Sequence, residues 1–199
     1  MARSVSYPKF VDISSIKLQE IGNYRYWLKV PFKNQRNLKI LCVILKNPSK
    51  ANNKTCDDTV RRVCNVANNH GYSEVIILNL FPYRSTNPKG LLNFYSNKYF
   101  KLIMACNLRK IIKICKNKDV VFAWGTNTIS SLKQNKNIYD LAITNITSII
   151  KNNTYFVKCC KCGYQTCNNQ YKASNSQHQH IRYPSHGLVW KNNSPMIRY

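Results

Sequence analysis

Two asparagines and an arginine stand where apolar runs of strand length come to an end, and their side chains suit recognition of a polar ligand. Asn79 lies near the end of the run 75–80, and Arg84 follows in the next loop. Asn47 comes directly after the run 39–45 and one lysine. An amide offers both donors and an acceptor to a ligand. If the runs are parallel strands, these side chains gather at the sheet edge where open α/β folds bind ligands.

Each of these residues also has a plainer explanation. Asn47 before Pro48 can be a simple turn, and Asn79 can be a buried amide with all its hydrogen bonds made. Only their shared placement at strand ends favours a site.

Alternating strand and helix patterns predict the scaffold. Strands are expected over residues 39–45, 75–80, 119–123 and 154–157, and helices from Asp57 or Asp58 to Gly71, over about 102–116, and over 138–151. This order predicts a parallel sheet with helices on both faces. We expect one α/β domain over residues 1–199, with an irregular segment at 1–36 in which residues 24–28 could form an edge strand.

The charge predicts a polyanionic partner. The chain has 31 Lys and Arg against 7 Asp and Glu, a formal net charge of +24. An A/T-rich genome could explain many lysines but does not explain the scarcity of acids. Nucleic acid is therefore the first candidate partner, and an anionic membrane surface is the weaker one. Without a leader or an apolar run long enough to span a membrane, we expect a soluble, cytoplasmic monomer.

Eight of the nine cysteines fall into two groups. Cys42, Cys64, Cys106 and Cys115 lie on apolar faces and are expected to be reduced core residues. The others of note lie in a Cys/Asn/Gln-rich segment at 158–180, where Cys159, Cys162, Cys167 and His178 are candidate zinc ligands. Because this spacing lacks the paired CxxC of a zinc ribbon, we expect reduced cysteines and keep a structural zinc as the alternative.

Several familiar chemistries lack their motifs. The chain has no GxGxxG, no GxxxxGK[ST], no GxSxG and no HExxH. Asp57 and Asp58 are the only adjacent carboxylates, which is too few for a usual two-metal nuclease site. We therefore expect no cofactor.

Short motifs resemble, in order, a widespread prokaryotic family of unknown function. They are Tyr24-Arg25-Tyr26-Trp27-Leu28, Asn47-Pro48-Ser49, Asp57-Asp58-Thr59-Val60-Arg61-Arg62, the NLFPYRSTNP stretch at 79–88, Phe122-Ala123-Trp124-Gly125 and Pro184-Ser185-His186. The resemblance extends over about residues 24–190, with 158–180 as an insertion. That family is in turn similar, in motif order, to the uracil-DNA glycosylase superfamily.

This second resemblance implies a fold and several roles. The fold would be a three-layer α/β sandwich around a central four-stranded parallel sheet. Asn47 would hold the attacking water and Asn79 would read a flipped base. Tyr183 stands where the superfamily has its closing histidine, whereas His186 fits the closing histidine of the unknown-function family, and we prefer His186.

The chemistry of glycosidic cleavage fits these residue types. Positive charge builds on the sugar and negative charge on the departing base, so the site needs a water and donors to the base. Asn47 can orient water but cannot take its proton, so Asp58 is our second choice and Asp57 an alternative. The expected set is Asn47, Asp58 and His186 for catalysis; Asn79, Phe81 and Tyr83 for the base; and Ser49, Lys50, Arg84, Ser185, Leu188 and Trp190 for DNA, the last two as wedges into the base stack.

The leading hypothesis is a DNA glycosylase that flips out a modified or non-canonical base and hydrolyses its glycosidic bond, leaving an abasic site. A modified pyrimidine of phage DNA, and hence antiviral defence, is the suggested context. The first alternative is a non-catalytic nucleic-acid-binding protein of the same fold, and the second is a nucleotide-processing enzyme.

Overall fold

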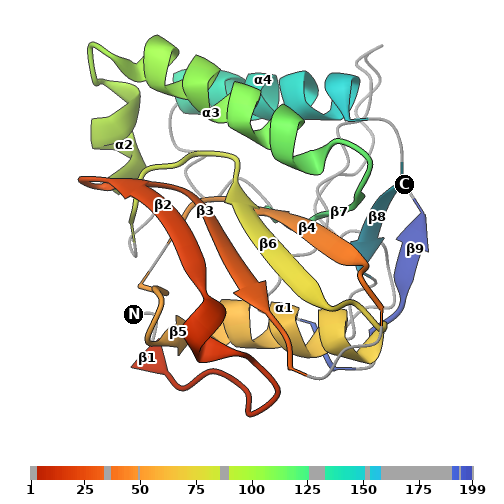
Figure 1. The fold of residues 1–199 in the computed structure, drawn as a ribbon. Helices are drawn as coiled ribbons and strands as arrows, with labels where there is room; N and C mark the ends of the chain where they lie inside the picture. Colours follow the sequence, from red (N-terminus) through yellow and green to blue (C-terminus); the bar gives the residue numbers. More distant parts are fainter. Residues whose placement is uncertain are drawn as a thin grey trace.

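The computed structural model describes residues 4–33, 37–48, 50–85, 90–125, 133–150, 153–157, 190–192 and 194–198. These residues form a seven-stranded mixed sheet with helices against both faces (Figure 1). The sheet order is β2-β3-β6-β4-β7-β8-β9, with β2 Lys17–Ile21, β3 Tyr24–Pro31, β4 Ile40–Leu45, β6 Glu74–Asn79, β7 Asp119–Phe122, β8 Thr154–Val157 and β9 Met196–Arg198. A short antiparallel pair, β1 Ser4–Val5 and β5 Cys56–Asp57, lies apart from it, and a 3-10 helix, η1, spans Ile13–Ser15.

The middle of the sheet consists of the four strands that the apolar runs predict. β6, β4, β7 and β8 are neighbours in that order, and each pair is parallel. The prediction of a sheet made only of these four was wrong, because β3 pairs antiparallel with β6 and β9 pairs antiparallel with β8. The architecture is therefore mixed α/β rather than purely parallel.

The segment expected to be irregular contains a β-hairpin. β2 and β3 pair antiparallel, and Gly22 in the turn has a φ of +54°, which suits glycine. β3 alternates between more and less buried residues and lies between β2 and β6, so it is an interior strand rather than an edge. The outer strand β2 is largely polar, which is why its sequence shows no apolar run.

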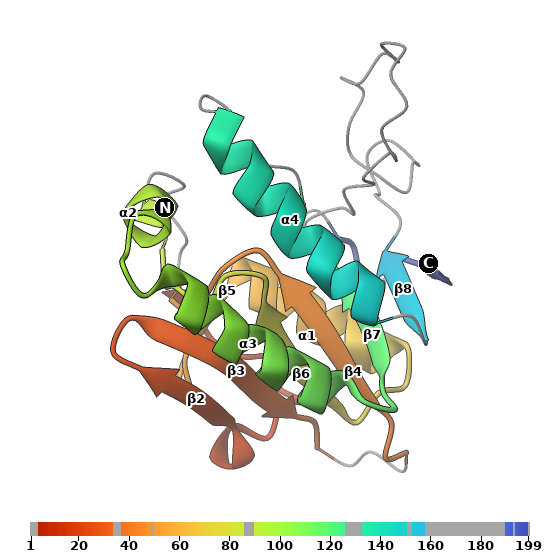
Figure 2. The same ribbon diagram turned by 90° about the horizontal axis from the view of Figure 1, so that it is seen from above.

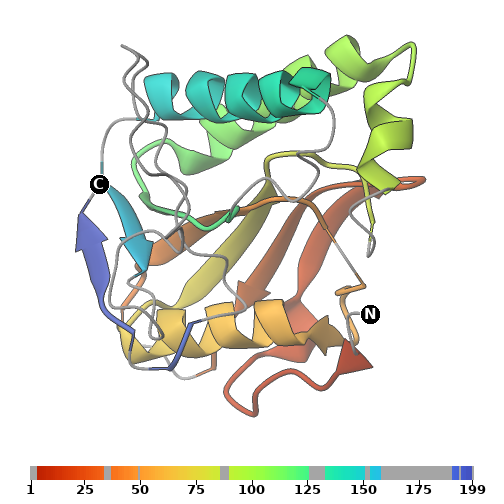
Figure 3. The ribbon, with the colours of Figure 1, turned by 180° about the vertical axis from the view of Figure 1, so that it is seen from behind.

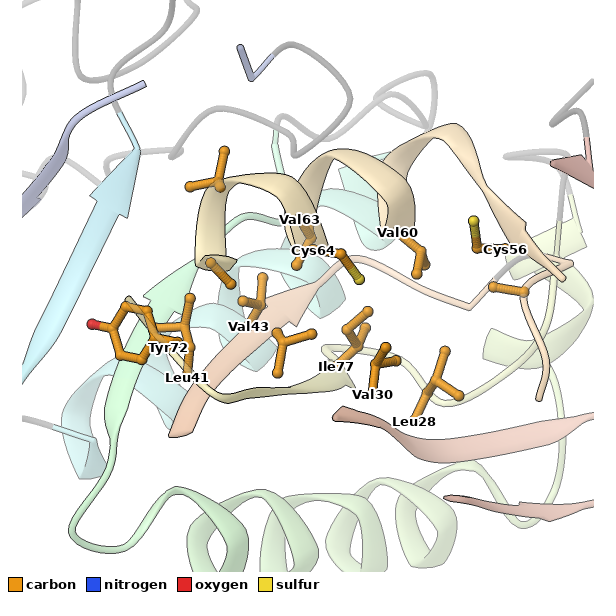
Figure 4. Packing of buried hydrophobic residues seen from close by; sticks show 14 of the residues in the cluster. Leu28, Val30, Leu41, Val43, Cys56, Val60, Val63, Cys64, Tyr72 and Ile77 are labelled. Carbon is orange, nitrogen blue, oxygen red and sulfur yellow. The ribbon is translucent and has the colours of Figure 1, made fainter. Parts of the chain in front are cut away.

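One face of the sheet is covered by α1, Asp58–Asn69. Val60, Val63 and Cys64 of the helix are buried against sheet residues such as Val43 and Ile77 (Figure 4). The Asp57 side chain caps the helix by accepting a hydrogen bond from the Val60 amide at 2.9 Å. At the other end Gly71 has a φ of +76°, which confirms the predicted stop.

The opposite face is covered by α3 and α4, with the short α2 beside them (Figure 2). Their bounds are α2 Gly90–Tyr95, α3 Phe100–Cys115 and α4 Lys133–Ile149. Cys42, Cys64 and Cys115 are buried free thiols, and Cys106 is half-buried, in agreement with the prediction of reduced core cysteines. Among the described helices, none has both the length and the apolar character needed to cross a bilayer.

The connections between the parallel strands change direction across the sheet between β4 and β7. From β4 it passes through α1 on one face to β6, and from β6 it passes through α2 and α3 on the other face to β7, on the far side of β4 (Figures 1 and 3). Ligands of open α/β sheets bind outside the carboxyl ends of strands at such a reversal. The ends of β4, β6 and β7 are therefore where a site is expected.

Candidate functional site at the carboxyl ends of the central strands

Asn47 joins the loops that follow β4 and β6. Its Nδ2 donates to the Ser85 carbonyl at 2.7 Å and to the Pro48 carbonyl at 3.2 Å. The Ser85 amide in turn donates to the Pro48 carbonyl at 3.0 Å. These bonds fix the orientation of the amide and use its donors, so Oδ1 is the atom suited to accept from a water or a ligand.

Asn79 is fully buried at the end of β6 and is incompletely hydrogen-bonded. Its Nδ2 donates to the Arg25 carbonyl at a long 3.4 Å. Its Oδ1 is buried and has no hydrogen-bond partner in the part of the chain that the structure describes. A buried acceptor without a partner is costly and uncommon, and it marks a position where a ligand donor would be favourable.

A buried guanidinium supports this end of the sheet. Arg25 is 1% exposed and donates from Nη1 to the Ala51 carbonyl at 2.8 Å, which Arg84 Nη1 also reaches at 3.3 Å. Burial and, after it, the nearby charge of Arg84 lower the pKa of Arg25 to about 10, and the charge of Asp57 opposes this change. Arg84 also forms an ion pair with Glu20. Arg84, expected to contact DNA, is therefore also a structural residue of the loop.

The two adjacent carboxylates are in different surroundings. Asp57 is 3% exposed and acts electrostatically on Arg25. Asp58, our expected base, is half-exposed and pairs with Arg61 at 2.8 Å. The structure therefore favours Asp57 over Asp58 as the carboxylate of this site, because the N-cap position turns Asp57 inward.

Replacing Asp57 with Ala should lower the free energy of unfolding by about 1–2 kcal/mol, because the change removes the helix N-cap bond to the Val60 amide and a buried carboxylate whose charge favours the ionised form of Arg25. Asp58→Ala, one residue later, should cost no more than about 1 kcal/mol, since it breaks only an exposed ion pair. Urea unfolding of both variants measures the difference. Equal losses would contradict the assignment of Asp57 as the buried N-cap residue.

Lys46 is a site residue that the sequence reasoning missed. It is the first residue after β4, and its Nζ lies 5.4 Å from the centre of the Tyr139 ring in α4. The Tyr139 hydroxyl donates to the Gly125 carbonyl at 2.8 Å, at the end of β7. Burial lowers the pKa of Lys46 to about 8. An ammonium that remains mostly charged at neutral pH therefore lies at the point where the strand connections reverse.

Lys46 should make the folded protein more stable as the pH rises from 8 towards 10.5. Its pKa of about 8 lies below the usual 10.5, so in this window the unfolded chain binds the additional proton and deprotonation favours folding. Lys46→Met should raise the free energy of unfolding at pH 7 by about 1–2 kcal/mol and remove part of the gain at alkaline pH. Urea unfolding at both pH values tests this, with the exposed Lys54→Met as control. A Lys46→Met protein that is less stable than the wild-type protein at pH 7 would contradict this prediction.

Two aromatic residues expected to stack on a base differ in accessibility. Phe81 is fully buried, and its ring lies 5.3 Å from Tyr95 and 6.0 Å from Tyr139, centre to centre. That position serves packing. Tyr83 is only half-buried and stacks on Phe94, with ring centres 5.4 Å apart and planes within 1°. Of the two, Tyr83 is the one whose ring remains accessible.

Trp190 does not have the exposed position that a wedge needs. Its side chain is fully buried in the core beneath α1, and its carbonyl accepts from Arg62 Nη1 at 3.0 Å. The expectation that it inserts into DNA is corrected, because the C-terminal segment packs back onto the helix. Lys50 is exposed, as a phosphate contact requires.

Several predicted residues lie outside the described part of the chain. They are Ser49, Ser185, His186, Leu188 and the zinc candidates Cys159, Cys162, Cys167 and His178. Tyr183, the alternative to His186, does too. Within the described ranges, no group of three or more Cys, His, Asp or Glu side chains could hold a metal ion.

Trp124 at the end of β7 completes this end of the sheet. Its side chain is fully buried against Phe122, and its indole Nε1 has no hydrogen-bond partner within the residues described. With Asn79, it gives this end a buried donor and a buried acceptor that have no hydrogen-bond partner among the residues described.

Comparison with known proteins identifies a family. The profile of a family described as a protein of unknown function, DUF1643, matches residues 25–180. No curated protein and no solved structure matches the chain. Because the profile matches more than half of the sequence, this chain belongs to the DUF1643 family.

Proposed function

We propose that this protein is a DNA glycosylase that extrudes a modified or non-canonical base and hydrolyses its N-glycosidic bond. The observation that carries the proposal is the pair of amides at adjacent strand ends, Asn47 and Asn79, of which Asn79 has a buried Oδ1 with no partner in the part of the chain that the structure describes. An amide of this kind can read the Watson–Crick edge of an extruded base. Asn47 Oδ1 would hold the water that attacks the sugar.

The fold proposed with this activity is that of the uracil-DNA glycosylase superfamily, a three-layer sandwich. Support comes from the order β6-β4-β7-β8 of the parallel strands and from helices on both faces. The motif order described above adds to it. The antiparallel strands β2, β3 and β9 would be additions at the sheet edges.

The charges suit the reaction. As the bond to the base breaks, negative charge develops on the base, and the Lys46 ammonium would stabilise it. The net charge of +24 would hold the DNA phosphates. Little base strength is needed, because the sugar already resembles an oxocarbenium ion when water attacks. Asn47 therefore acts by positioning, with Asp57 as the buried carboxylate of the same end.

The runner-up is a non-catalytic nucleic-acid-binding protein, which the exposed ion pair of Asp58 and the full burial of Asn79 favour. Incubation with double- and single-stranded DNA at several salt concentrations, followed by alkali to reveal abasic sites, separates the two. A glycosylase gives breaks at abasic sites. Binding that weakens steeply with salt and leaves no alkali-labile sites in any DNA would support the runner-up.

The substrate base we propose is a modified pyrimidine of phage DNA, and the role is antiviral defence. The support is the resemblance described above, in which Tyr183 stands where the uracil-DNA glycosylase superfamily has its closing histidine. Plating of phages with modified and unmodified DNA on cells that express the protein tests the role. Equal plating of all phages would count against it.

A further inference from the structure

A cavity of about 300 Å³ is lined mainly by residues of α3 and α4, the helices that cover one face of the sheet in Figure 2. Its walls are mostly apolar and come from both helices, with Met104 and Leu108 on one side and Ile138 and Ile146 on the other. Leu80, just after β6, contributes to its lining. The volume is at the lower end of the range for small-molecule pockets.

The lining includes one buried polar side chain, Asn107, whose hydrogen bonds are only partly made within the described residues. Asn107 is 1% exposed, and its Nδ2 donates to the carbonyls of Asn79 at 2.9 Å and Leu80 at 3.2 Å. These two bonds determine which side of the amide carries the oxygen. That Oδ1 is buried and has no hydrogen-bond partner among the described residues. An acceptor left in apolar surroundings favours a ligand that brings a donor.

The mouth of the cavity has a positive charge. Lys101 lines it and is exposed, six residues before Asn107, roughly 9 Å away along the helix axis. Asn145 is exposed on the α4 side, and no acidic residue is part of the lining. An anionic group on a ligand would therefore be favoured at the mouth.

We propose that this cavity binds a small molecule with an apolar ring, an N–H or O–H donor directed to Asn107 Oδ1, and an anionic group near Lys101. The apolar ring would replace water along the helix walls, which supplies most of the affinity. The donor supplies specificity, because a molecule without it leaves Asn107 Oδ1 unsatisfied. Asn107 is also hydrogen-bonded to the Asn79 carbonyl, so ligand binding should perturb the end of β6.

Indole-3-acetate is a suitable probe, because it has an apolar ring, one N–H and a carboxylate. Its matched control is 1-methylindole-3-acetate, in which a methyl group replaces the hydrogen of the N–H donor. In NMR titrations of the full chain, we expect indole-3-acetate to bind about 5- to 10-fold more tightly than the methylated compound. Shifts should occur in α3, in α4 and at Asn79 and Leu80. Asn107→Leu should remove the difference between the two probes, and Lys101→Gln should weaken both equally.

Ala105→Trp provides an independent control, because Ala105 is exposed on α3 and lines the cavity. A bulky ring there should block both probes while the fold is retained. The comparison of the two probes on the wild-type protein holds even if Asn107→Leu fails to fold. Equal affinities of the probes, no binding of either one, or shifts confined to other regions would overturn the proposal.

Discussion

Asn47→Ala should abolish most base release while DNA binding persists. The expected loss is about a hundred- to ten-thousand-fold in the rate of excision, because the attacking water loses the group that positions it. Binding should change little, since phosphate contacts supply most of the affinity for DNA. Single-turnover rates, with enzyme in excess over DNA, measure the chemical step without product release.

Asn53→Ala is the matched control for this experiment. Asn53 lies in the same loop after β4 and is exposed. Because Asn47 also ties the loop to the Ser85 carbonyl, thermal unfolding of both variants is needed to separate a catalytic loss from a misplaced loop. If Asn47→Ala excises base at the wild-type rate, Asn47 is not the water-holding residue.

The Asn79→Leu variant should lose excision activity but keep a free energy of unfolding close to that of the wild-type protein. A buried amide with all its bonds made would cost about 1–3 kcal/mol when it is removed. Asn79 Oδ1 has no partner in the described residues, and its Nδ2 makes only a 3.4 Å contact. Replacement by a similar-sized apolar side chain should therefore keep the free energy of unfolding within about 1 kcal/mol of wild type. Excision should fall by about a hundredfold or more, because the base is no longer read.

Thr154→Val controls for the removal of a buried polar group elsewhere. Thr154 is 3% exposed at the start of β8, the end of the parallel strands opposite to the site. The Thr154→Val variant should excise the base at the wild-type rate. A strongly destabilised Asn79→Leu protein would show that the amide is structural, and a stable variant with full activity would exclude it from base recognition.

The parallel strands and main helices were predictable because their signals are local. β4 and β6 are continuous apolar runs, as strands covered on both faces must be. α1 has its apolar residues at helical spacing between a capping Asp and a glycine. β2 and β9 were missed for physical reasons, since β2 is a polar outer strand and β9 has only three residues. Their pairing depends on the neighbouring strand rather than on their own pattern.

The site could be predicted only as a location. The sequence placed Asn47 and Asn79 at strand ends, but the choice between Asp57 and Asp58 depends on which residue faces Arg25 across the fold. The burial of Lys46 depends on Tyr139 in a distant helix, so no local signal marks it. Trp190 was misassigned because an aromatic residue in a basic tail resembles a DNA wedge until the tail is seen to pack against α1.

The most direct test of the central claim is a search for released base. The purified protein is incubated with DNA from bacterial hosts and from phages with modified bases, and small molecules are separated and identified by mass spectrometry. We predict a free base together with an equal amount of abasic sites in one class of DNA, and release of both at a rate at least about a hundredfold lower with Asn47→Ala. DNA that is bound but releases no base from any source would contradict the glycosylase assignment.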